Sequence, residues 1–364
     1  MLKVLVIKPS SLGDIIHCAE AVESIARARL DCRVSWVVNS EYADFVRELP
    51  GVFDALAFPR SRFRLSRFPF WLPEAASWFV SLRQGFDVAV DFQGLQRSGL
   101  MALWSGAQER FGFREAREAS WIYYNRPVEV PRSLCHAGDK VNYLASQVLE
   151  RSDLLSSASR AQTVPGTSEN GERFRITVPN AVHEAVRSVL GDVRGPILAL
   201  CPGSRWASKR WPTARWVELL GLLAKAHSDV HPVFLGAPDE RAEIEAIIGE
   251  ARVPADCLAG RVDLWQTAAV LESAVAAVTM DSAPLHLAVA VGTPTVSLFG
   301  PTDPERVGPR GEEHRILRKD LDCLGCYERE CPLERRVCLP EVDAREVLEA
   351  VESTFQSITP KITQ

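Results

Sequence analysis

A chain of 364 residues, 46% hydrophobic and 24% charged, has the composition of a globular protein and is long enough for two hydrophobic cores. Its formal net charge of −5 argues against general nucleic-acid binding, so we expect no nucleic-acid partner. No apolar stretch is long enough for a signal peptide or a membrane span, which predicts a cytoplasmic location. There, the nine cysteines are expected to be thiols or metal ligands rather than disulfides.

The first predicted element is a buried strand over residues 3–8, followed by a turn and a helix. Apolar residues recur at helical spacing in this helix, at Ile15, Ala19, Val22 and Ala26. Asp14 falls in the first turn, where the helix dipole favours a carboxylate. It is either an ordinary helix-start residue or a carboxylate that takes a proton from a hydroxyl.

Strands are next expected over residues 33–38 and 52–58, and the stretch after them is unusual for an acidic chain. Between Pro59 and Leu72, aromatic and aliphatic residues alternate with the arginines Arg60, Arg62, Arg64 and Arg67. Arginine forks pair with carboxylates and phosphates, and aromatic rings favour membrane interfaces. The stretch is therefore either a site for an acidic ligand or an anionic membrane, or a solvated loop beside a hydrophobic anchor.

A strand over residues 86–91 leads into Gln93 and Gly94. In a doubly wound sheet, the carboxyl end of a strand is where the ligand cleft lies. From 151 to 173 the composition changes to Ser, Thr, Gly and Pro without periodicity, which indicates a flexible segment. We therefore predict two domains, 1–172 and 173–364.

The second half repeats the α/β pattern. A strand over 196–201 leads into a loop with Ser204, Lys209 and Arg210, and a helix follows from Thr213. A lysine is a compact donor for a diphosphate, although this loop is neither a Walker A motif nor a G-x-G-x-x-G motif. The next strand is predicted over 233–236.

The stretch 274–300 is predicted to form a strand–helix–strand unit around which the rest of the second half is arranged. A buried strand precedes Asp281 and Ser282, which can cap a helix that ends at Gly292, and a further strand follows over 295–299. The junction of a strand's carboxyl end with a helix amino terminus offers backbone N–H groups to a phosphate. The alternative is an ordinary crossover with a capped helix.

The last motif is a C-x2-C-x4-C-x6-C cluster formed by Cys323, Cys326, Cys331 and Cys338. Four thiolates can hold zinc or iron tetrahedrally. The cluster is either such a structural metal site or a set of free thiols.

Six motifs occur in the same order as in one known family: Ser10-Ser-Leu-Gly-Asp14, Asp91-Phe-Gln-Gly94, Lys209-Arg-Trp-Pro212, Gly236-Ala-Pro238, Asp281-Ser-Ala-Pro-Leu-His286 and Phe299-Gly-Pro-Thr-Asp303. The chain resembles the ADP-heptose:lipopolysaccharide heptosyltransferases of glycosyltransferase family nine. The resemblance implies an α/β fold of GT-B architecture, with two Rossmann-like domains facing each other across a cleft. The first domain would bind the acceptor, and the second the nucleotide sugar.

The resemblance also implies roles for particular residues. Asp14 matches the catalytic base. The positions that match donor-binding residues are Ser204, Lys209, Asp281, Ser282, Ala283 and His286. Ala283 stands where the family usually has glycine, and its methyl group would crowd the phosphates. The positions that match acceptor-binding residues are Ser11, Gly13, Arg60, Arg62, Arg64, Gln93 and Arg117.

The implied activity is inverting transfer of heptose from ADP-heptose to the lipopolysaccharide inner core, a lipid A-Kdo type acceptor. The enzyme would contact the anionic inner membrane peripherally and need no cofactor for catalysis, and some related enzymes are thought to hold iron through such cysteines. Within the family, the alternative is another nucleotide sugar or a protein acceptor, as in autotransporter heptosylation. A nicotinamide-dependent oxidoreductase would need a glycine fingerprint that the first strand lacks. A cysteine-based metal-binding module would leave the other motifs unused.

Overall fold

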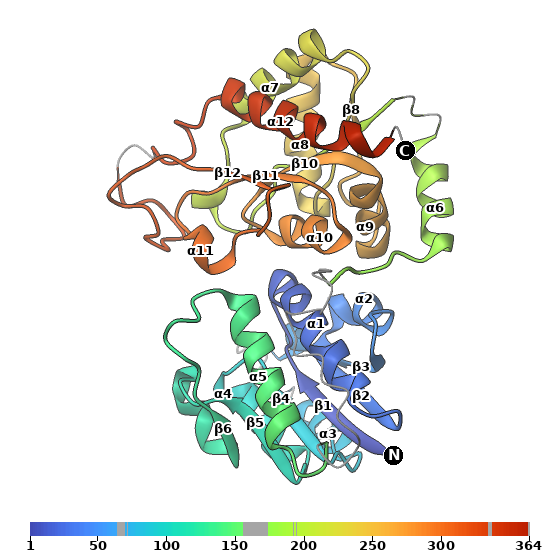
Figure 1. The fold of residues 1–364 in the computed structure, drawn as a ribbon, viewed down its shortest axis with the longest axis vertical. Helices are drawn as coiled ribbons and strands as arrows, with labels where there is room; N and C mark the ends of the chain where they lie inside the picture. Colours follow the sequence, from blue (N-terminus) through green and yellow to red (C-terminus); the bar gives the residue numbers. More distant parts are fainter. Residues whose placement is uncertain are drawn as a thin grey trace. The chain divides into compact units, whose positions relative to one another are not determined.

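The structure, a computed structural model, describes residues 1–63, 70, 72–155, 174–191, 193, 195–333 and 337–362, without the side chains of 356–362. The chain forms two compact units, Met1–Phe174 and Arg175–Gln364, each with its own sheet (Figure 1). The boundary predicted after residue 172, and the flexible segment predicted before it from residue 156 on, lie outside the described residues.

The first unit is built on six parallel strands in the order β3-β2-β1-β4-β5-β6. The strands are β1 Leu2–Ile7, β2 Cys32–Asn39, β3 Val52–Phe58, β4 Val88–Asp91, β5 Glu109–Phe113 and β6 Arg126–Val128. The helices are α1 Leu12–Arg27, α2 Ala43–Arg47, α3 Leu72–Ser81, α4 Gln96–Trp104 and α5 Ala137–Arg151. The 3₁₀ turns are η1 Ser40–Tyr42, η2 Arg60–Arg62 and η4 Arg117–Tyr123.

The second unit has another six parallel strands, in the order β12-β11-β10-β7-β8-β9. The strands are β7 Ile197–Cys201, β8 His231–Phe234, β9 Asp256–Cys257, β10 Ala274–Met280, β11 Thr295–Leu298 and β12 Arg315–Leu317. The helices are α6 Asn180–Leu190, α7 Thr213–Ala226, α8 Arg241–Ala251, α9 Leu264–Ser273, α10 Ala283–Val291, α11 Pro304–Val307 and α12 Ala344–Ile362. The 3₁₀ turns are η5 Ala207–Lys209 and η6 Pro238–Glu240.

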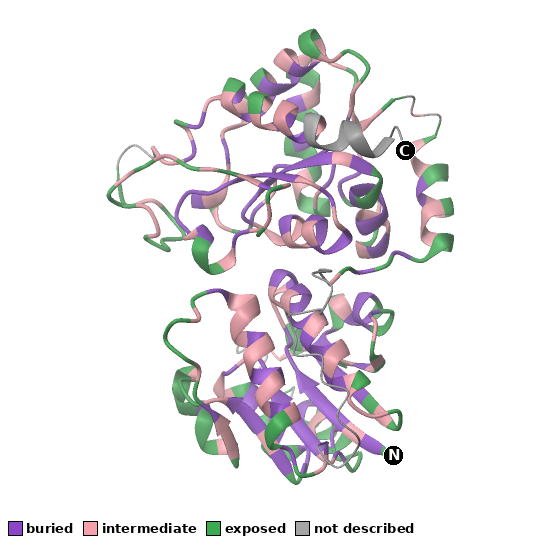
Figure 2. Ribbon diagram, in the orientation of Figure 1, coloured by how far each residue is buried: buried purple, intermediate pink, exposed green. Residues whose placement is uncertain are grey.

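The central strands have nearly continuous apolar sequences because helices cover both faces of each sheet. The residues of β1 and β10 are almost all buried, as the purple ribbon in Figure 2 shows. The strand predicted over 233–236 lies two residues earlier, as β8 over His231–Phe234, and the N–H of His231 donates to the carbonyl of Pro196, the residue before β7, at 2.8 Å. The other predicted strands are found within about two residues of their expected bounds.

Each unit has its own hydrophobic core. In the second unit, α7 and α12 pack together around Trp211 and Trp216, whose rings meet edge to face at 5.0 Å. In the first, Leu5 and Ile7 of β1 pack with Phe58 and Met101. Among the described helices, none combines the length and the hydropathy needed to cross a bilayer.

Both sheets have the Rossmann strand order, in which the order reverses between the first and fourth strands of the sheet. The reversal falls between β1 and β4 in the first unit and between β7 and β10 in the second. Ligands of open α/β sheets bind beyond the carboxyl ends of the strands at such a point. The loops after these four strands carry most of the residues that the sequence predicts to be catalytic or ligand-binding.

Candidate active site

The loop after β1 brings Asp14 to the first turn of α1. The backbone N–H and the hydroxyl of Ser11 donate to Asp14 Oδ2 at 2.9 and 2.8 Å. These bonds turn the carboxylate back toward the helix amino terminus, where the dipole favours negative charge. The Asp14 side chain keeps 45% of its accessible surface, so a substrate can reach it. Gly13, in the same turn, is buried.

Lys8 is a member of this site that the sequence prediction left out. Its side chain is 9% exposed, and its Nζ lies 3.9 Å from Asp14 Oδ2 and donates to the Phe92 carbonyl at 3.4 Å. Burial alone raises the pKa of Asp14, but Lys8, the Ser11 hydrogen bonds and His17 together hold that pKa below its ordinary value. Asp14 is therefore ionised at neutral pH.

The buried carboxylate of Asp91 at the end of β4 fixes the loop that carries Gln93. Asp91 Oδ1 accepts the N–H groups of Gln93 and Gly94 at 2.8 and 3.1 Å, and Oδ2 accepts the Tyr124 hydroxyl at 2.7 Å. Burial raises the pKa of Asp91 in spite of these bonds. Gln93 Oε1 in turn accepts the N–H of Ser10 at 3.4 Å, so the loops after β1 and β4 are joined.

A pocket of about 470 Å³, part of it open solvent, lies against these two loops. The residues around it include Ser10, Asn39, Phe58, Arg60, Gln93 and Arg97. The guanidinium of Arg97 lies 5.6 Å from the centre of the Phe58 ring. Two guanidinium groups and two amides in one pocket favour a ligand that carries carboxylates or phosphates.

The arginines predicted to bind the acceptor are not all in this pocket. Arg60 lines it, whereas Arg62 pairs with Glu74 at 2.7 Å on the exposed surface. Arg117 begins the turn η4, is exposed and is not among the residues that line the pocket. Arg64 lies outside the described residues.

In the second unit, the loop after β7 meets the loop after β10 through a buried ion pair. Lys209 Nζ lies 2.6 Å from Asp281 Oδ2, and the side chains are 15% and 5% exposed. The Thr302 hydroxyl also donates to Asp281 Oδ2. The ammonium lies 4.6 Å from the centre of the Trp206 ring, which fixes the lysine from another side. The lysine is thus held at the carboxyl edge of the second sheet.

Helix α10 begins at Ala283 with Pro284 in its first turn and ends at Gly292 in the left-handed conformation, as predicted. The predicted side-chain cap is wrong, because Asp281 instead binds Lys209 and the Ser282 hydroxyl donates to the carbonyl of Met280. Ser282 still occupies the residue before the helix. The first N–H groups of α10 therefore have no side-chain cap from these residues.

The remaining predicted donor residues lie on the same elements. His286 is half-buried one turn into α10, and Ser204 is buried in the loop after β7, where its carbonyl accepts the Arg210 guanidinium at 2.9 Å. A residue that the sequence prediction missed is Glu240. Its carboxylate lies so close to Gly203 that a Cβ at that position would be 2.1 Å from Glu240 Oε1. A side chain at position 203 would therefore require the Glu240 carboxylate to move.

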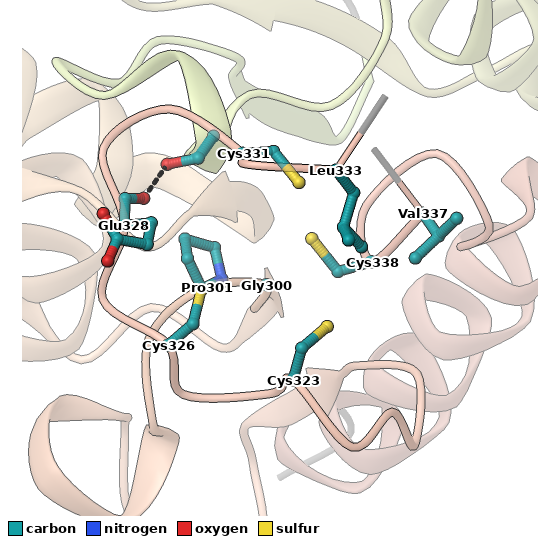
Figure 3. Close-up of a pocket in the computed structure, with 10 residues that line it drawn as sticks. Gly300, Pro301, Cys323, Cys326, Glu328, Cys331, Leu333, Val337 and Cys338 are labelled. Atoms are coloured by element: carbon teal, nitrogen blue, oxygen red, sulfur yellow. Dashed lines mark hydrogen bonds between the residues drawn. The ribbon is translucent and has the colours of Figure 1, made fainter. Parts of the chain in front are cut away.

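The four cysteines of the cluster line one pocket of the second unit (Figure 3). The sulfur atoms of Cys323, Cys331 and Cys338 point into the same space, whereas Cys326 lies beside Pro301. None of the four is in a disulfide bond. Within the described residues, no three Cys, His, Asp or Glu side chains are close enough together to hold one metal ion.

The cysteine segment is also tied to the loop that carries Lys209. The Ser208 hydroxyl donates to the Glu328 carbonyl at 2.6 Å, the dashed line in Figure 3, and the Ser208 N–H donates to the Arg329 carbonyl at 3.2 Å. The Arg329 guanidinium lies 5.6 Å from the centre of the Trp206 ring, the same ring that Lys209 contacts. The cysteine segment therefore supports the lysine loop.

Two units with Rossmann strand order, each with polar side chains at its topological switch point, give the chain the GT-B fold. The family model for glycosyltransferase family 9 (heptosyltransferase) matches residues 76–336, and the chain belongs to this family.

Comparison with known proteins agrees with this membership. Lipopolysaccharide heptosyltransferase 1 of Pseudomonas aeruginosa is 29% identical over 91% of this chain and 87% of its own length. The structure of the ADP-heptose lipopolysaccharide heptosyltransferase II of E. coli has a TM-score of 0.76 at 20% identity, covering 98% of this chain and 99% of that one. The iron-containing dodecameric glycosyltransferase TibC of enterotoxigenic E. coli has a TM-score of 0.54 at 14% identity, covering 98% and 77%.

Proposed function

We propose that this heptosyltransferase moves heptose from ADP-heptose to the inner core of lipopolysaccharide, an acceptor of the lipid A-Kdo type. The observation that carries the proposal is the pair of switch-point sites, one with an ionised carboxylate and one with a lysine paired to a buried aspartate. The names of the relatives, lipopolysaccharide heptosyltransferases that include an ADP-heptose enzyme, support the donor and the acceptor.

In the proposed reaction, Asp14 removes the proton of an acceptor hydroxyl as that oxygen attacks the anomeric carbon of the heptose. The new glycosidic bond forms on the face opposite the ADP group. The bond from the anomeric carbon to the diphosphate breaks, ADP leaves with the electron pair, and the configuration inverts. Because Asp14 is ionised at neutral pH and partly exposed, it is ready to accept the proton.

The donor diphosphate is proposed to bind between Lys209 and the amino terminus of α10, at Ser282 and Ala283. A lysine and uncapped helix N–H groups stabilise the charge that develops on the leaving diphosphate, so the reaction needs no catalytic metal. Asp281 holds Lys209 in place, and Ser204 and His286 complete this proposed site.

The acceptor is proposed to bind in the pocket of the first unit, near Ser11 and Gly13. Arg60 and Gln93 line that region and offer donors to the acidic sugar. Arg62, Arg64 and Arg117 are proposed to extend this surface, with Arg62 exchanging its partner Glu74 for an acceptor carboxylate.

A donor screen tests the proposed function. Purified protein is incubated with a lipid A-Kdo acceptor and a panel of nucleotide sugars, and nucleotide release is measured for each. We expect release with ADP-heptose and at least about tenfold less with the others. Release only from another nucleotide sugar would select the alternative donor within the family.

Replacing Lys8 tests the environment of Asp14. In Lys8→Met, burial of Asp14 is no longer opposed by the ammonium, so the pKa of Asp14 rises toward its ordinary value or beyond. The acid limb of the pH profile of kcat/KM should therefore move to higher pH, while the ADP dissociation constant stays the same. Lys8→Arg keeps the charge and should keep the acid limb in place. An unmoved limb in Lys8→Met would show that Lys8 does not act through Asp14.

We also propose that the cysteine cluster holds a structural zinc or iron. Four thiols around one pocket fit such an ion in donor number and kind, although they must move closer to share it. The iron-containing relative TibC supports this proposal. The ion would brace the segment that supports the Lys209 loop.

Metal analysis after purification without chelator should find about one zinc or iron per chain. The double variant Cys323→Ser/Cys326→Ser should lose it, whereas Cys135→Ser, at an exposed cysteine outside the cluster, should retain it. A metal-free wild-type protein that is as stable as the metal-treated one would support free thiols instead.

The proposed location is the cytoplasmic side of the inner membrane, because the acceptor is anchored there by its lipid. The enzyme is proposed to contact the anionic membrane surface peripherally. The sequence predicts this contact for the stretch from Arg60 to Trp71, in which residues 64–69 and 71 lie outside the described residues.

A further inference from the structure

Large apolar side chains of the first unit are exposed on three neighbouring elements, α3, α4 and η4. We refer to them as the α3–α4–η4 face: Leu72, Val80, Leu100, Leu103, Trp104, Trp121 and Ile122. Each is between 40% and 61% exposed. Scattered apolar residues are normal on protein surfaces, but a patch of this kind marks an interaction site.

Helix α4 has an inverted pattern of burial. It buries its small and polar residues Ser98, Gly99 and Ala102 together with Met101, and it exposes Leu100, Leu103 and Trp104. A helix that covers the core of a water-surrounded protein shows the opposite arrangement. Small residues let the backbone lie close to η4, since a Cβ on Gly99 would be 2.5 Å from the Tyr123 ring. The larger residues are left facing outward.

Helix α4 contacts both α3 and η4. The Trp104 ring lies 6.1 Å from the ring of Phe79 in α3, with the two rings edge to face. On the other side, the Tyr123 hydroxyl of η4 donates to Gln96 Oε1 of α4 at 2.7 Å. Val80 and Trp121 therefore lie on elements that contact the helix of Trp104, although they are distant from it in sequence.

Cations accompany the two tryptophans of the face. The Arg83 guanidinium lies 5.1 Å from the centre of the Trp104 ring, and the Arg114 guanidinium lies 5.9 Å from that of Trp121. Neither arginine forms an ion pair with a carboxylate of the described residues. Their charges are thus available to lipid phosphates, and tryptophan with arginine is the combination that suits the headgroup layer.

We propose that the α3–α4–η4 face docks on an anionic lipid bilayer. Leu103, Trp104 and their apolar neighbours would enter the boundary between headgroups and acyl chains, while Arg83 and Arg114 pair with lipid phosphates. The proposal rests on the proposed function, because a lipid-anchored acceptor requires the enzyme to work at a membrane. The face consists of described residues.

Sedimentation with vesicles tests the proposal on the whole protein. Wild type should bind vesicles of phosphatidylethanolamine and phosphatidylglycerol at least about tenfold more tightly than vesicles of phosphatidylcholine. Leu103→Gln/Trp104→Gln should lose at least tenfold in binding to the anionic vesicles at any salt concentration. Arg83→Gln/Arg114→Gln should lose binding at low salt and match wild type at high salt, because only its electrostatic contribution is screened.

Phe53→Gln is the matched control, since Phe53 is a 57% exposed aromatic of the same unit with the Arg33 guanidinium 4.3 Å from its ring centre. It should bind vesicles like wild type. Transfer to a deacylated, water-soluble acceptor should be unchanged in all three variants, which separates docking from catalysis and folding. Failure of heptosyl transfer in wild type would reject the proposed function. The vesicle experiment would still test the docking proposal by itself.

Two results would overturn the docking proposal. One is equal vesicle binding by wild type and Leu103→Gln/Trp104→Gln. The other is a dimeric wild type that does not bind vesicles and becomes monomeric in that variant, which would make the face a contact between two copies of the chain.

Discussion

Asp14→Asn is expected to lower kcat for heptosyl transfer at least about a hundredfold, the scale of a lost general base. The amide has the shape of the carboxylate and an oxygen that can still accept the Ser11 hydrogen bonds, so α1 should fold normally. An amide cannot take a proton from the acceptor hydroxyl at neutral pH. The measurement is steady-state transfer with saturating donor and acceptor, together with calorimetric titration of ADP.

ADP affinity should stay within about twofold of wild type in this variant, because the proposed donor residues belong to the other unit. Asp44→Asn is the control, as Asp44 is a fully exposed aspartate of the same unit that pairs with Arg47. It should transfer at the wild-type rate. Turnover of Asp14→Asn within tenfold of wild type would remove Asp14 from the chemistry.

Lys209→Ala is expected to weaken ADP binding at least about thirtyfold, or about 2 kcal/mol. Two effects add in the same direction. The variant loses the ammonium that would pair with the diphosphate, and it leaves Asp281, which is 5% exposed, as an uncompensated negative charge beside the ligand. Calorimetric titration with ADP measures the change directly.

Lys225→Ala serves as the control because Lys225 is an exposed lysine in the last turn of α7 in the same unit. Its ADP affinity should equal that of wild type. Lys209→Arg should recover part of the affinity, since it restores the charge but not the compact ammonium. An unchanged ADP affinity in Lys209→Ala would place the donor site elsewhere.

The sequence predicted most of the architecture because the fold is made of elements with strong local patterns. Uninterrupted apolar runs predicted β1 and β10, and Gly292 correctly predicted the end of α10. The family motifs fall in loops after strands, so their positions in the fold followed once the strands were assigned. The departure from family glycine at Ala283 is accommodated at the first residue of a helix, a conformation that alanine adopts readily.

The contacts within the site could not be predicted because they join residues that are distant in the chain. Local rules made Asp281 a helix cap, but Lys209, 72 residues earlier, forms the ion pair with it. Likewise, the Tyr124 hydroxyl donates to Asp91, 33 residues earlier, and no sequence pattern predicts such a pair. The sequence shows Lys8 as a charge directly after a buried strand. Its pairing with Asp14 depends on the position of α1 and could not be predicted from that pattern.

The prediction for the arginine-rich stretch shows the same limit. Composition marked it as cationic and aromatic, but composition does not say which arginine faces a ligand. In the structure Arg60 lines the pocket and Arg62 pairs with Glu74. The exposed apolar side of α4 could not be predicted because its apolar residues have the spacing of any amphipathic helix. Only the observed burial shows which side faces the core.

Mass spectrometry of the acceptor tests the central claim most directly. Wild-type protein, ADP-heptose and a lipid A-Kdo acceptor are incubated, and the acceptor mass and the ADP released are measured in the same sample. We expect the acceptor to gain the mass of one heptose residue, with one ADP released for each heptose transferred and no gain in Asp14→Asn. ADP release without a change in acceptor mass, or a mass gain only with a different nucleotide sugar, would contradict the proposed function.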